Sequence, residues 1–204
     1  MPKISAQQRQ DRRLQILQAA TRCFARKGFH GASMEDIVRE SRLSPGAIYC
    51  YFRGKRQIVA AIAQERHSRE SALLAGLAAS PNLAEGLDGL ARSFFAMLQD
   101  PGEKQRRKVS IQVWAESLHD RHIRQIVERG LRQRDPLVRS LRDGQRAGQL
   151  PAGLDAESLS RVLLALLQGF ILQQAWEPDL DAGGYLETVT RLLGCVIRKP
   201  ADVL

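Results

Sequence analysis

The chain has 204 residues, 44% of them hydrophobic, which is enough for one well-filled core or for a small domain attached to a larger one. Its formal net charge is +9, and the excess lies in residues 1–60, which hold 12 Lys and Arg against 4 Asp and Glu. This asymmetry favours a polyanionic partner, and the most apolar window, residues 162–172, is too short to span a bilayer.

The first two predicted helices are marked by stop and cap residues. In residues 6–27 apolar side chains recur at helical spacing, and Gly28 is expected to end this first helix. Ser33 followed three residues later by Asp36 is the pattern of an N-cap residue with a reciprocal acid. A brief second helix is therefore expected after Ser33, ending near residue 41.

A third helix is predicted immediately after a tight turn. Ser44 is its expected N-cap, and Pro45 stands at the first helical position, where its missing N–H costs nothing. One face carries Ile48 and Phe52 and can pack on the first two helices, while the opposite face stays free. This arrangement is typical of a helix-turn-helix unit whose second helix reads DNA bases. The free face consists of Ala47, Cys50 and part of Tyr49, and Tyr51 lies beside the packed face.

The rest of the chain also has helical periodicity. Breaker sequences separate the predicted helices, and Pro136 is expected to kink or split its helix, because proline removes a backbone hydrogen bond. Since no alternating strand pattern occurs, an all-α fold of about nine helices is predicted. The predicted ranges after the third helix are 55–79, 83–99, 103–118, 120–148, 155–176 and 182–198.

Residues 8–60 resemble the DNA-binding domain of TetR-type transcriptional regulators at many fixed offsets. The matching residues are Ile16-Leu17-Gln18-Ala19-Ala20, Phe24-Ala25-Arg26-Lys27-Gly28-Phe29, Gly31-Ala32-Ser33, Asp36-Ile37-Val38, Ser44-Pro45-Gly46-Ala47-Ile48-Tyr49-Cys50-Tyr51-Phe52 and Gly54-Lys55. Val113-Trp114-Ala115-Glu116 and Gly148-Gln149-Leu150 resemble the BetI-like subgroup. The resemblance implies an N-terminal three-helix helix-turn-helix DNA-binding domain, residues 1–55, and a larger helical ligand-binding and dimerisation domain, residues 56–204.

The resemblance also implies which residues meet double-stranded DNA. Phosphate contacts are expected from Ser33, Tyr49, Tyr51 and Lys55, and close approach to the base edges from Ser44, Pro45, Gly46 and Ala47. For the tyrosines the alternative is packing inside the three-helix unit, and for Lys55 it is an ordinary surface lysine. Cys50 stands where the family more often has Tyr, Trp or another residue able to reach DNA, and its weakly donating thiol leaves its contribution to DNA binding open.

Dimerisation is expected because one such domain reads too few base pairs to be selective, so a homodimer on a palindromic operator is predicted. The last two predicted helices are the expected interface, and the alternative is a monomer that buries the same residues in its own core. The resemblance further implies a repressor that a small-molecule effector releases from DNA through a population shift. The candidate effector-site residues, each of which can instead simply pack in the core, are Phe94, Phe95, Leu98, Val113, Trp114, Ser117, Leu118, Phe170, Gln173 and Trp176.

The sequence carries no recognisable pattern for catalysis or metal binding. Its histidines lack H-E-x-x-H spacing, and neither a nucleophile elbow, a P-loop nor a dinucleotide-binding fingerprint occurs. Cys23, Cys50 and Cys195 are widely separated, so a disulfide framework is not predicted and a cytoplasmic location is expected. No catalytic residue, cofactor or metal is therefore expected. Two alternatives stay open: an enzyme, and a helical adaptor whose basic head binds a membrane or an acidic protein.

Overall fold

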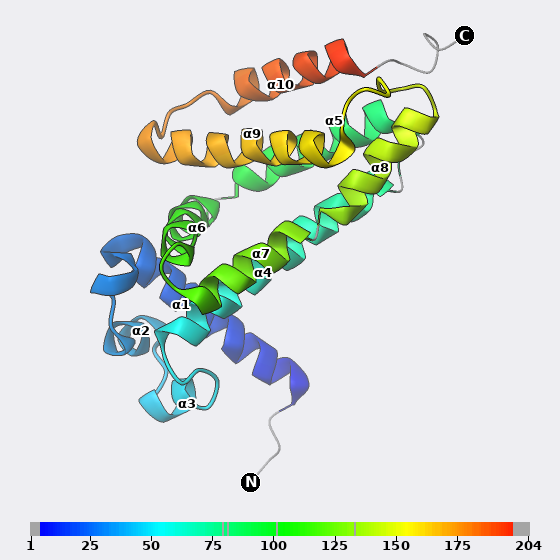
Figure 1. Ribbon diagram of the computed structural model, residues 1–204. Coiled ribbons are helices and arrows are strands. Elements are labelled where there is room, and N and C mark those ends of the chain that lie inside the picture. Colours follow the sequence, from blue (N-terminus) through cyan, green and yellow to red (C-terminus); the bar gives the residue numbers. More distant parts are fainter. Residues whose placement is uncertain (1–4, 79, 81, 101, 133, 198–204) are drawn as a thin grey trace. The chain divides into compact units, whose positions relative to one another are not determined.

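The computed structural model describes residues 5–78, 80, 82–100, 102–132 and 134–197, and the regular structure in these ranges is entirely α-helical (Figure 1). The all-α prediction is therefore confirmed. In chain order the helices are α1 (Ala6–Gly31), α2 (Met34–Ser41), α3 (Pro45–Tyr49), α4 (Lys55–Ala78), α5 (Leu83–Leu98), α6 (Glu103–Ser117), α7 (Arg121–Arg132), α8 (Asp135–Arg146), α9 (Ala156–Trp176) and α10 (Ala182–Val196).

Local sequence signals explain where the first helices begin and end. α1 kinks at Gly28, which has φ 75° and ψ 165°, at the point where the sequence predicted a stop. Both α1 and α2 begin with a reciprocal capping box, formed by Ser5 with Gln8 and by Ser33 with Asp36. An N-cap side chain of this kind contributes about 1 kcal/mol to helix stability.

The predicted helix over residues 120–148 is divided in two. α7 ends at Arg132, and α8 begins at Asp135 with Pro136 in its first turn, where the missing N–H leaves no intrahelical hydrogen bond unmade. The described part of the chain therefore contains ten helices, whereas about nine were predicted. The additional helix results from the division at Pro136, which the sequence had indicated as a possible split.

The helices divide into two compact units. Residues 1–66 and 104–129 make up unit 1, and residues 67–103 and 130–204 make up unit 2. α4, α6 and α7 each contribute residues to both units. The predicted helix-turn-helix segment thus lies in unit 1 together with parts of three later helices.

The core of unit 1 joins the three N-terminal helices to the beginning of α4 and to α6 and α7. Phe24, Ile37 and Ile48 are each at most 1% exposed. Burial of such a side chain stabilises the fold by about 1.5–3 kcal/mol relative to leaving it exposed. The same core also includes Ile16, Leu17, Phe52, Ile58, Val109, Val113, Ile123 and Ile126.

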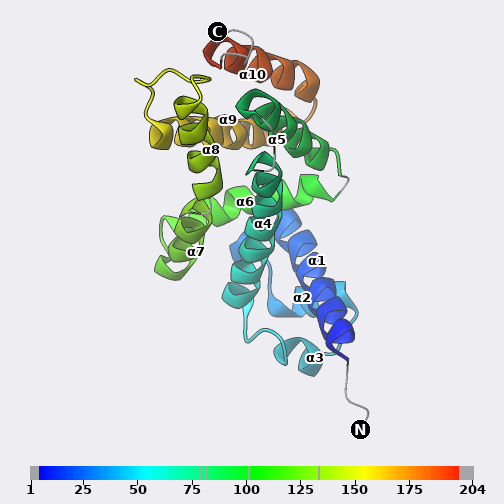
Figure 2. The same ribbon diagram turned by 90° about the vertical axis from the view of Figure 1, so that its right-hand side faces the viewer.

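Unit 2 is built on a leucine-rich core. α5 lies against α8 and α10, and α8 lies against α9 (Figures 1 and 2). The core leucines are Leu74, Leu77, Leu83, Leu87, Leu137, Leu141 and Leu150. Among the described residues, none of the helices combines the length and the apolar character needed to cross a membrane.

Candidate nucleic-acid interface

A tight turn between α2 and α3 is held from two sides. Arg42 ends α2 in the left-handed conformation, with φ 57° and ψ 27°. The carbonyl oxygen of Ser41 accepts a hydrogen bond from Gln15 Nε2 of α1 at 2.8 Å, and Ser41 Oγ accepts one from the Leu43 backbone N–H at 3.3 Å. Ser44 then caps α3, with its side chain accepting a backbone N–H from inside the helix. These contacts set the direction of α3 relative to α1 and α2.

α3 has one buried and one exposed face, as its sequence predicts. Ile48 is fully buried, and Phe52, just beyond the helix, is 5% exposed. Tyr51 is half-buried and packs against the core of unit 1, whereas Tyr49 is 50% exposed. The outer face therefore carries one large ring among small side chains. Ser44, Pro45, Gly46 and Cys50 are exposed, and Ala47 is half-buried.

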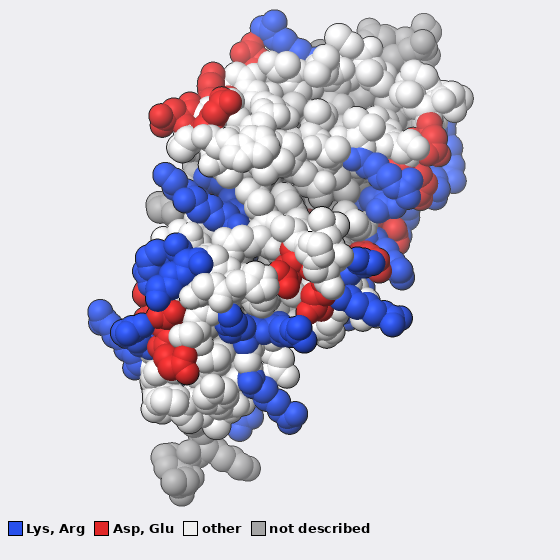
Figure 3. All heavy atoms as spheres, turned by 60° about the vertical axis from the view of Figure 1, so that its left-hand side comes forward, with Lys and Arg blue, Asp and Glu red and all other residues white. Residues whose placement is uncertain are grey.

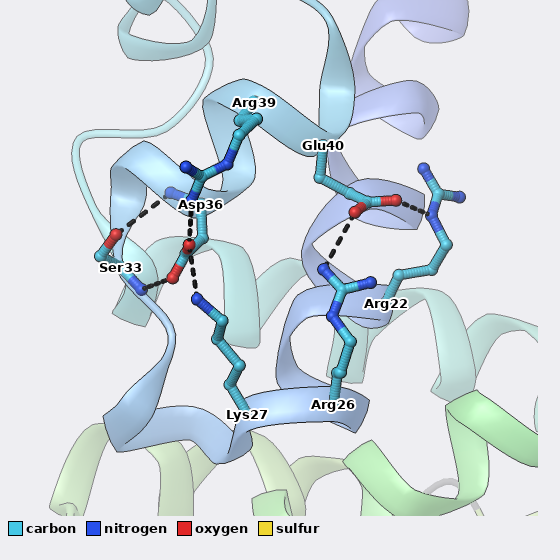
Figure 4. Close-up of polar contacts among 7 residues, drawn as sticks. All are labelled: Arg22, Arg26, Lys27, Ser33, Asp36, Arg39 and Glu40. Carbon is cyan, nitrogen blue, oxygen red and sulfur yellow. Dashed lines mark hydrogen bonds and ion pairs between the residues drawn. The ribbon is translucent and has the colours of Figure 1, made fainter.

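Asp36 joins α1, the cap of α2 and α2 itself (Figure 4). Its carboxylate accepts hydrogen bonds from Lys27 Nζ at 2.7 Å, from the Arg39 guanidinium at 2.5 Å and from the Ser33 backbone N–H at 3.0 Å. The bond from Lys27, followed by the bond from Ser33, holds the pKa of Asp36 well below its ordinary value of 3.8. The carboxylate is therefore ionised at neutral pH and compensates basic charge beside the turn.

Glu40 connects α2 to α1 in the same way. It accepts hydrogen bonds from Arg22 Nε at 2.6 Å and from Arg26 at 3.0 Å (Figure 4), and these two bonds hold the pKa of Glu40 below its ordinary value. On the face shown in Figure 3, Lys and Arg lie in separate groups, several of them beside Asp or Glu. Much of the positive charge of the N-terminal third is thus paired with acidic side chains of the same chain.

Ser33 and Lys55, two of the expected phosphate contacts, have intramolecular partners. Ser33 Oγ accepts a backbone N–H of α2 at 3.1 Å, as predicted for an N-cap residue. The Lys55 ammonium donates to the carbonyl oxygens of Phe29, His30 and Ala32, at 2.9, 3.3 and 2.6 Å. Because a lysine ammonium has three N–H donors, a phosphate contact by Lys55 would replace one of these bonds.

Arg42 and Arg53 are two cations next to α3 that were not among the predicted contacts. Both are exposed, and neither guanidinium has a hydrogen bond or ion pair within the ranges that the structure describes. Their places just before and just after α3 can be read from the sequence. Their lack of an acidic partner there depends on the folded arrangement of α1 and α2.

α6 is tied to the C-terminal part of α1 within unit 1. Gln112 Nε2 donates a hydrogen bond to the Phe24 carbonyl oxygen at 3.0 Å, and Glu116 pairs with His30 Nε2 at 2.9 Å. A small cavity beside these contacts is lined by Phe24, Phe29, Val59, Val109, Gln112, Val113 and Glu116. A displacement of α6 would therefore act directly on the helix that supports α2.

Three of the candidate effector-site residues form an aromatic cluster in unit 2. Phe94, Phe95 and Phe170 are buried, and the ring centroids of Phe95 and Phe170 are 4.9 Å apart. Tyr185, which was not predicted, lies 4.7 Å from Phe170 between ring centroids and donates its hydroxyl hydrogen to the Leu166 carbonyl oxygen at 2.9 Å. The cluster combines aromatic surface with one polar group.

The other candidate effector-site residues differ in exposure. In unit 2, Leu98 is buried, whereas Gln173 and Trp176 are exposed. In unit 1, Val113 and Ser117 are buried, Trp114 is half-buried and Leu118 is exposed. Helical periodicity indicated which residues share a face, but it did not separate buried positions from positions at the surface.

Two family models match the chain. The model described as bacterial regulatory proteins, tetR family, matches residues 16–62. The model described as BetI-type transcriptional repressor, C-terminal, matches residues 84–197, which is more than half of the chain. Together they confirm the family resemblance of the N-terminal residues and the BetI-like resemblance of the later ones.

Individual relatives match over nearly the whole length. UidR, an HTH-type transcriptional regulator of Escherichia coli strain K12, is 22% identical over 193 residues, which cover 92% of this chain and 94% of UidR. The structure of Salmonella enterica GusR is 26% identical with a TM-score of 0.77, covering 94% of this chain and 97% of GusR. The complex of triclosan with SmeT, a Stenotrophomonas maltophilia repressor, is 24% identical with a TM-score of 0.80 over 95% of both chains. This chain belongs to the tetR family of bacterial regulatory proteins, and its C-terminal part is of the BetI type.

Proposed function

We propose that this protein represses transcription by binding a palindromic double-stranded DNA operator as a homodimer, and that a small-molecule effector releases it. One observation carries the proposal: Ile48 and Phe52 anchor α3 in the core while the opposite face of this helix is exposed. A recognition helix held in this way can enter the major groove. Membership of the tetR family supports the same function.

In this proposal, residues 1–55 are the DNA-binding domain, and the exposed start of α3 approaches the base edges. Ser44, Pro45, Gly46 and Ala47 are small, so the backbone can come close to the bases. Tyr49 reaches a phosphate or a thymine methyl group, and Cys50 lies beside it on the same exposed surface. Ser33, Tyr51 and Lys55 are the further proposed phosphate contacts.

α9 and α10 are the proposed dimer interface within a ligand-binding and dimerisation domain, residues 56–204. Val162 of α9 is 55% exposed and Leu192 of α10 is 57% exposed. Phe170, Ile171 and Val189 are buried within the protomer and hold these helices in place. Exposed apolar side chains on two neighbouring helices are surface that a second copy can bury.

The aromatic cluster of unit 2 is the proposed centre of effector binding. Phe95, Phe170 and Tyr185 supply aromatic surface, and the side-chain oxygen of Gln174 in α9 is buried without a hydrogen-bond partner among the described residues. An aromatic wall with a few polar groups is typical of small-molecule sites. Triclosan bound to SmeT is an example of a small molecule held by a relative with this fold.

Effector binding would shift the population of dimers toward a spacing of α3 helices that no longer fits successive major-groove faces. Within unit 1, the contacts of Gln112 with Phe24 and of Glu116 with His30 would carry a displacement of α6 to α1. An effector drives this release only if it binds the free protein more tightly than the DNA-bound protein.

The test is selection of bound sequences from random duplex DNA by the full chain, followed by titration of the selected duplex in moderate salt. We expect an inverted repeat and a dissociation constant of about 10⁻⁸–10⁻¹¹ M, at least about 10³-fold tighter than for a scrambled duplex. Equal binding to the selected and scrambled duplexes would contradict operator recognition. Binding to anionic vesicles or an acidic protein alone would favour the adaptor alternative.

A ligand screen on the protein–operator complex tests the effector. We expect a releasing compound to raise the dissociation constant of the operator and to bind the free protein more tightly than the complex. Equal affinity of the compound for both forms would rule out release by a population shift.

A further inference from the structure

Arg42 occupies a backbone conformation that favours glycine. Its φ of 57° is positive, and Arg42 is the one non-glycine residue with positive φ in the part of the chain that the structure describes. The positive-φ positions at residues 28 and 148 are both glycine. An L side chain in the left-handed region crowds the following carbonyl oxygen, so glycine at position 42 would be more favourable for the fold alone.

The side chain of Arg42 has no partner among the described residues that would explain why arginine stands at this position. It is exposed, and its guanidinium forms no hydrogen bond or ion pair with the described residues. The neighbouring cations differ, because Arg22 and Arg26 are bound by Glu40, and Lys27 and Arg39 are bound by Asp36. Asp36 and Glu40 are thus already engaged by other basic side chains, and Arg42 is left available for an external anion.

The backbone around Arg42 is well held. The Ser41 carbonyl accepts the Gln15 side-chain N–H, and the Leu43 N–H is bound by Ser41 Oγ. Arg42 is two residues before Ser44, the N-cap of α3. The guanidinium therefore extends from a defined point at the edge of the surface that the proposed function assigns to DNA. Its planar set of N–H donors is suited to bidentate binding of a phosphate.

We propose that Arg42 binds a phosphate of the operator backbone beside the groove that α3 enters. The inference rests on the proposed DNA-binding function and adds a contact outside the predicted set. A phosphate contact explains why arginine stands where the fold favours glycine, since the contact exists only in the complex. It contributes affinity and salt dependence without sequence preference.

The test compares Arg42→Gly, Arg42→Lys and wild-type full chain on the selected operator duplex from about 50 to about 200 mM salt. We expect Arg42→Gly to melt at a higher temperature than wild type and yet to bind roughly tenfold more weakly at low salt. The slope of log affinity against log salt should decrease in magnitude by about one, with unchanged sequence preference. Arg42→Lys should keep most of the slope.

Arg139→Ala is the matched control, because Arg139 is an exposed arginine of α8 in unit 2 without a partner among the described residues. It removes the same charge and should leave the salt slope unchanged. Specific wild-type binding together with an unchanged slope in Arg42→Gly would overturn the Arg42 contact and leave the proposed function intact. A wild-type chain that binds the selected duplex no better than a scrambled one would overturn both. A lower melting temperature of Arg42→Gly would overturn the explanation from backbone strain.

Discussion

The ammonium of Lys55 donates a hydrogen bond to the carbonyl oxygen of Ala32 at 2.6 Å, so the first residue of α4 holds the segment between α1 and α2. The same nitrogen lies 5.1 Å from the centroid of the Phe29 ring and donates to the Phe29 carbonyl oxygen at 2.9 Å. Phe29 lies in the last turn of α1 and Ala32 is the C-cap of this helix, where the last carbonyl groups lack an intrahelical hydrogen-bond partner. Lys55 thus stabilises the position of α2 in the free protein.

Lys55→Ala should lower both stability and DNA affinity. Loss of the hydrogen bonds from a charged donor is expected to destabilise unit 1 by about 1–3 kcal/mol, measured by chemical denaturation. If Lys55 also contacts a phosphate, the salt slope of binding falls by about one for all DNA sequences. A loss of stability with an unchanged salt slope would mean that Lys55 binds only the backbone carbonyls of the free protein and does not contact a phosphate.

Ala47→Arg should change sequence choice. Ala47 is half-buried in the first turn of α3, and a long cation there would meet the base edges that its methyl group leaves free. We expect a new preferred base at one position of each half-site, measured by selection from random DNA. Wild-type operator preference and affinity in this variant would argue that this turn of α3 stays outside the groove.

Asp36→Asn should lower the stability of unit 1 at neutral pH and make that stability depend less on pH in the acidic range. The native pKa of Asp36 is depressed, first by the hydrogen bond from Lys27, so ionised Asp36 stabilises the fold above its ordinary pKa of 3.8. That stabilisation is lost as the pH falls below 3.8 toward the native value. Urea midpoints from about pH 7 to about pH 2 should therefore converge for the two proteins. A constant gap between them would contradict this assignment.

Gly130→Ala should destabilise unit 2, although alanine usually favours a helix. A Cβ at Gly130 would overlap the ring of His67, which is 8% exposed. We expect a loss of about 1–3 kcal/mol from this overpacking. Gly89→Ala is the control, since Gly89 is an exposed residue of α5 with open space around it and should gain up to about 1 kcal/mol. If thermal denaturation showed both variants to be stabilised equally, the ring of His67 would have to move aside without cost.

Leu192→Arg should prevent dimerisation without unfolding the protomer. Leu192 is 57% exposed, so the substitution leaves the protomer core intact but puts a charge into the proposed α9 and α10 interface. Sedimentation at micromolar concentration is expected to give a 22.8 kDa particle with unchanged helical content. Leu131→Arg, at a 38% exposed leucine of α7, should stay dimeric. A monomeric wild-type protein would contradict the interface itself.

Local patterns allowed the sequence by itself to determine the helical elements around α3. Ser33 and Ser44 cap the helices that they were expected to cap, and Ile48 and Phe52 are buried as their spacing predicts. Caps and periodicity act within a few residues, so no long-range contact is needed to read them. Pro136 marked the division between α7 and α8 for the same reason.

Only the tertiary structure decided which basic residues are free beside α3. Asp36 reaches back nine residues to Lys27, and Lys55 reaches back to carbonyls more than twenty residues away. Such partners follow from the packing of α1, α2 and α4. The number of charged residues in the sequence does not show which of them are paired. The sequence therefore determined a basic N-terminal third and a capped third helix with one buried face. Folding paired most of the charges around α1 and α2 and left Arg42 and Arg53 without partners among the described residues.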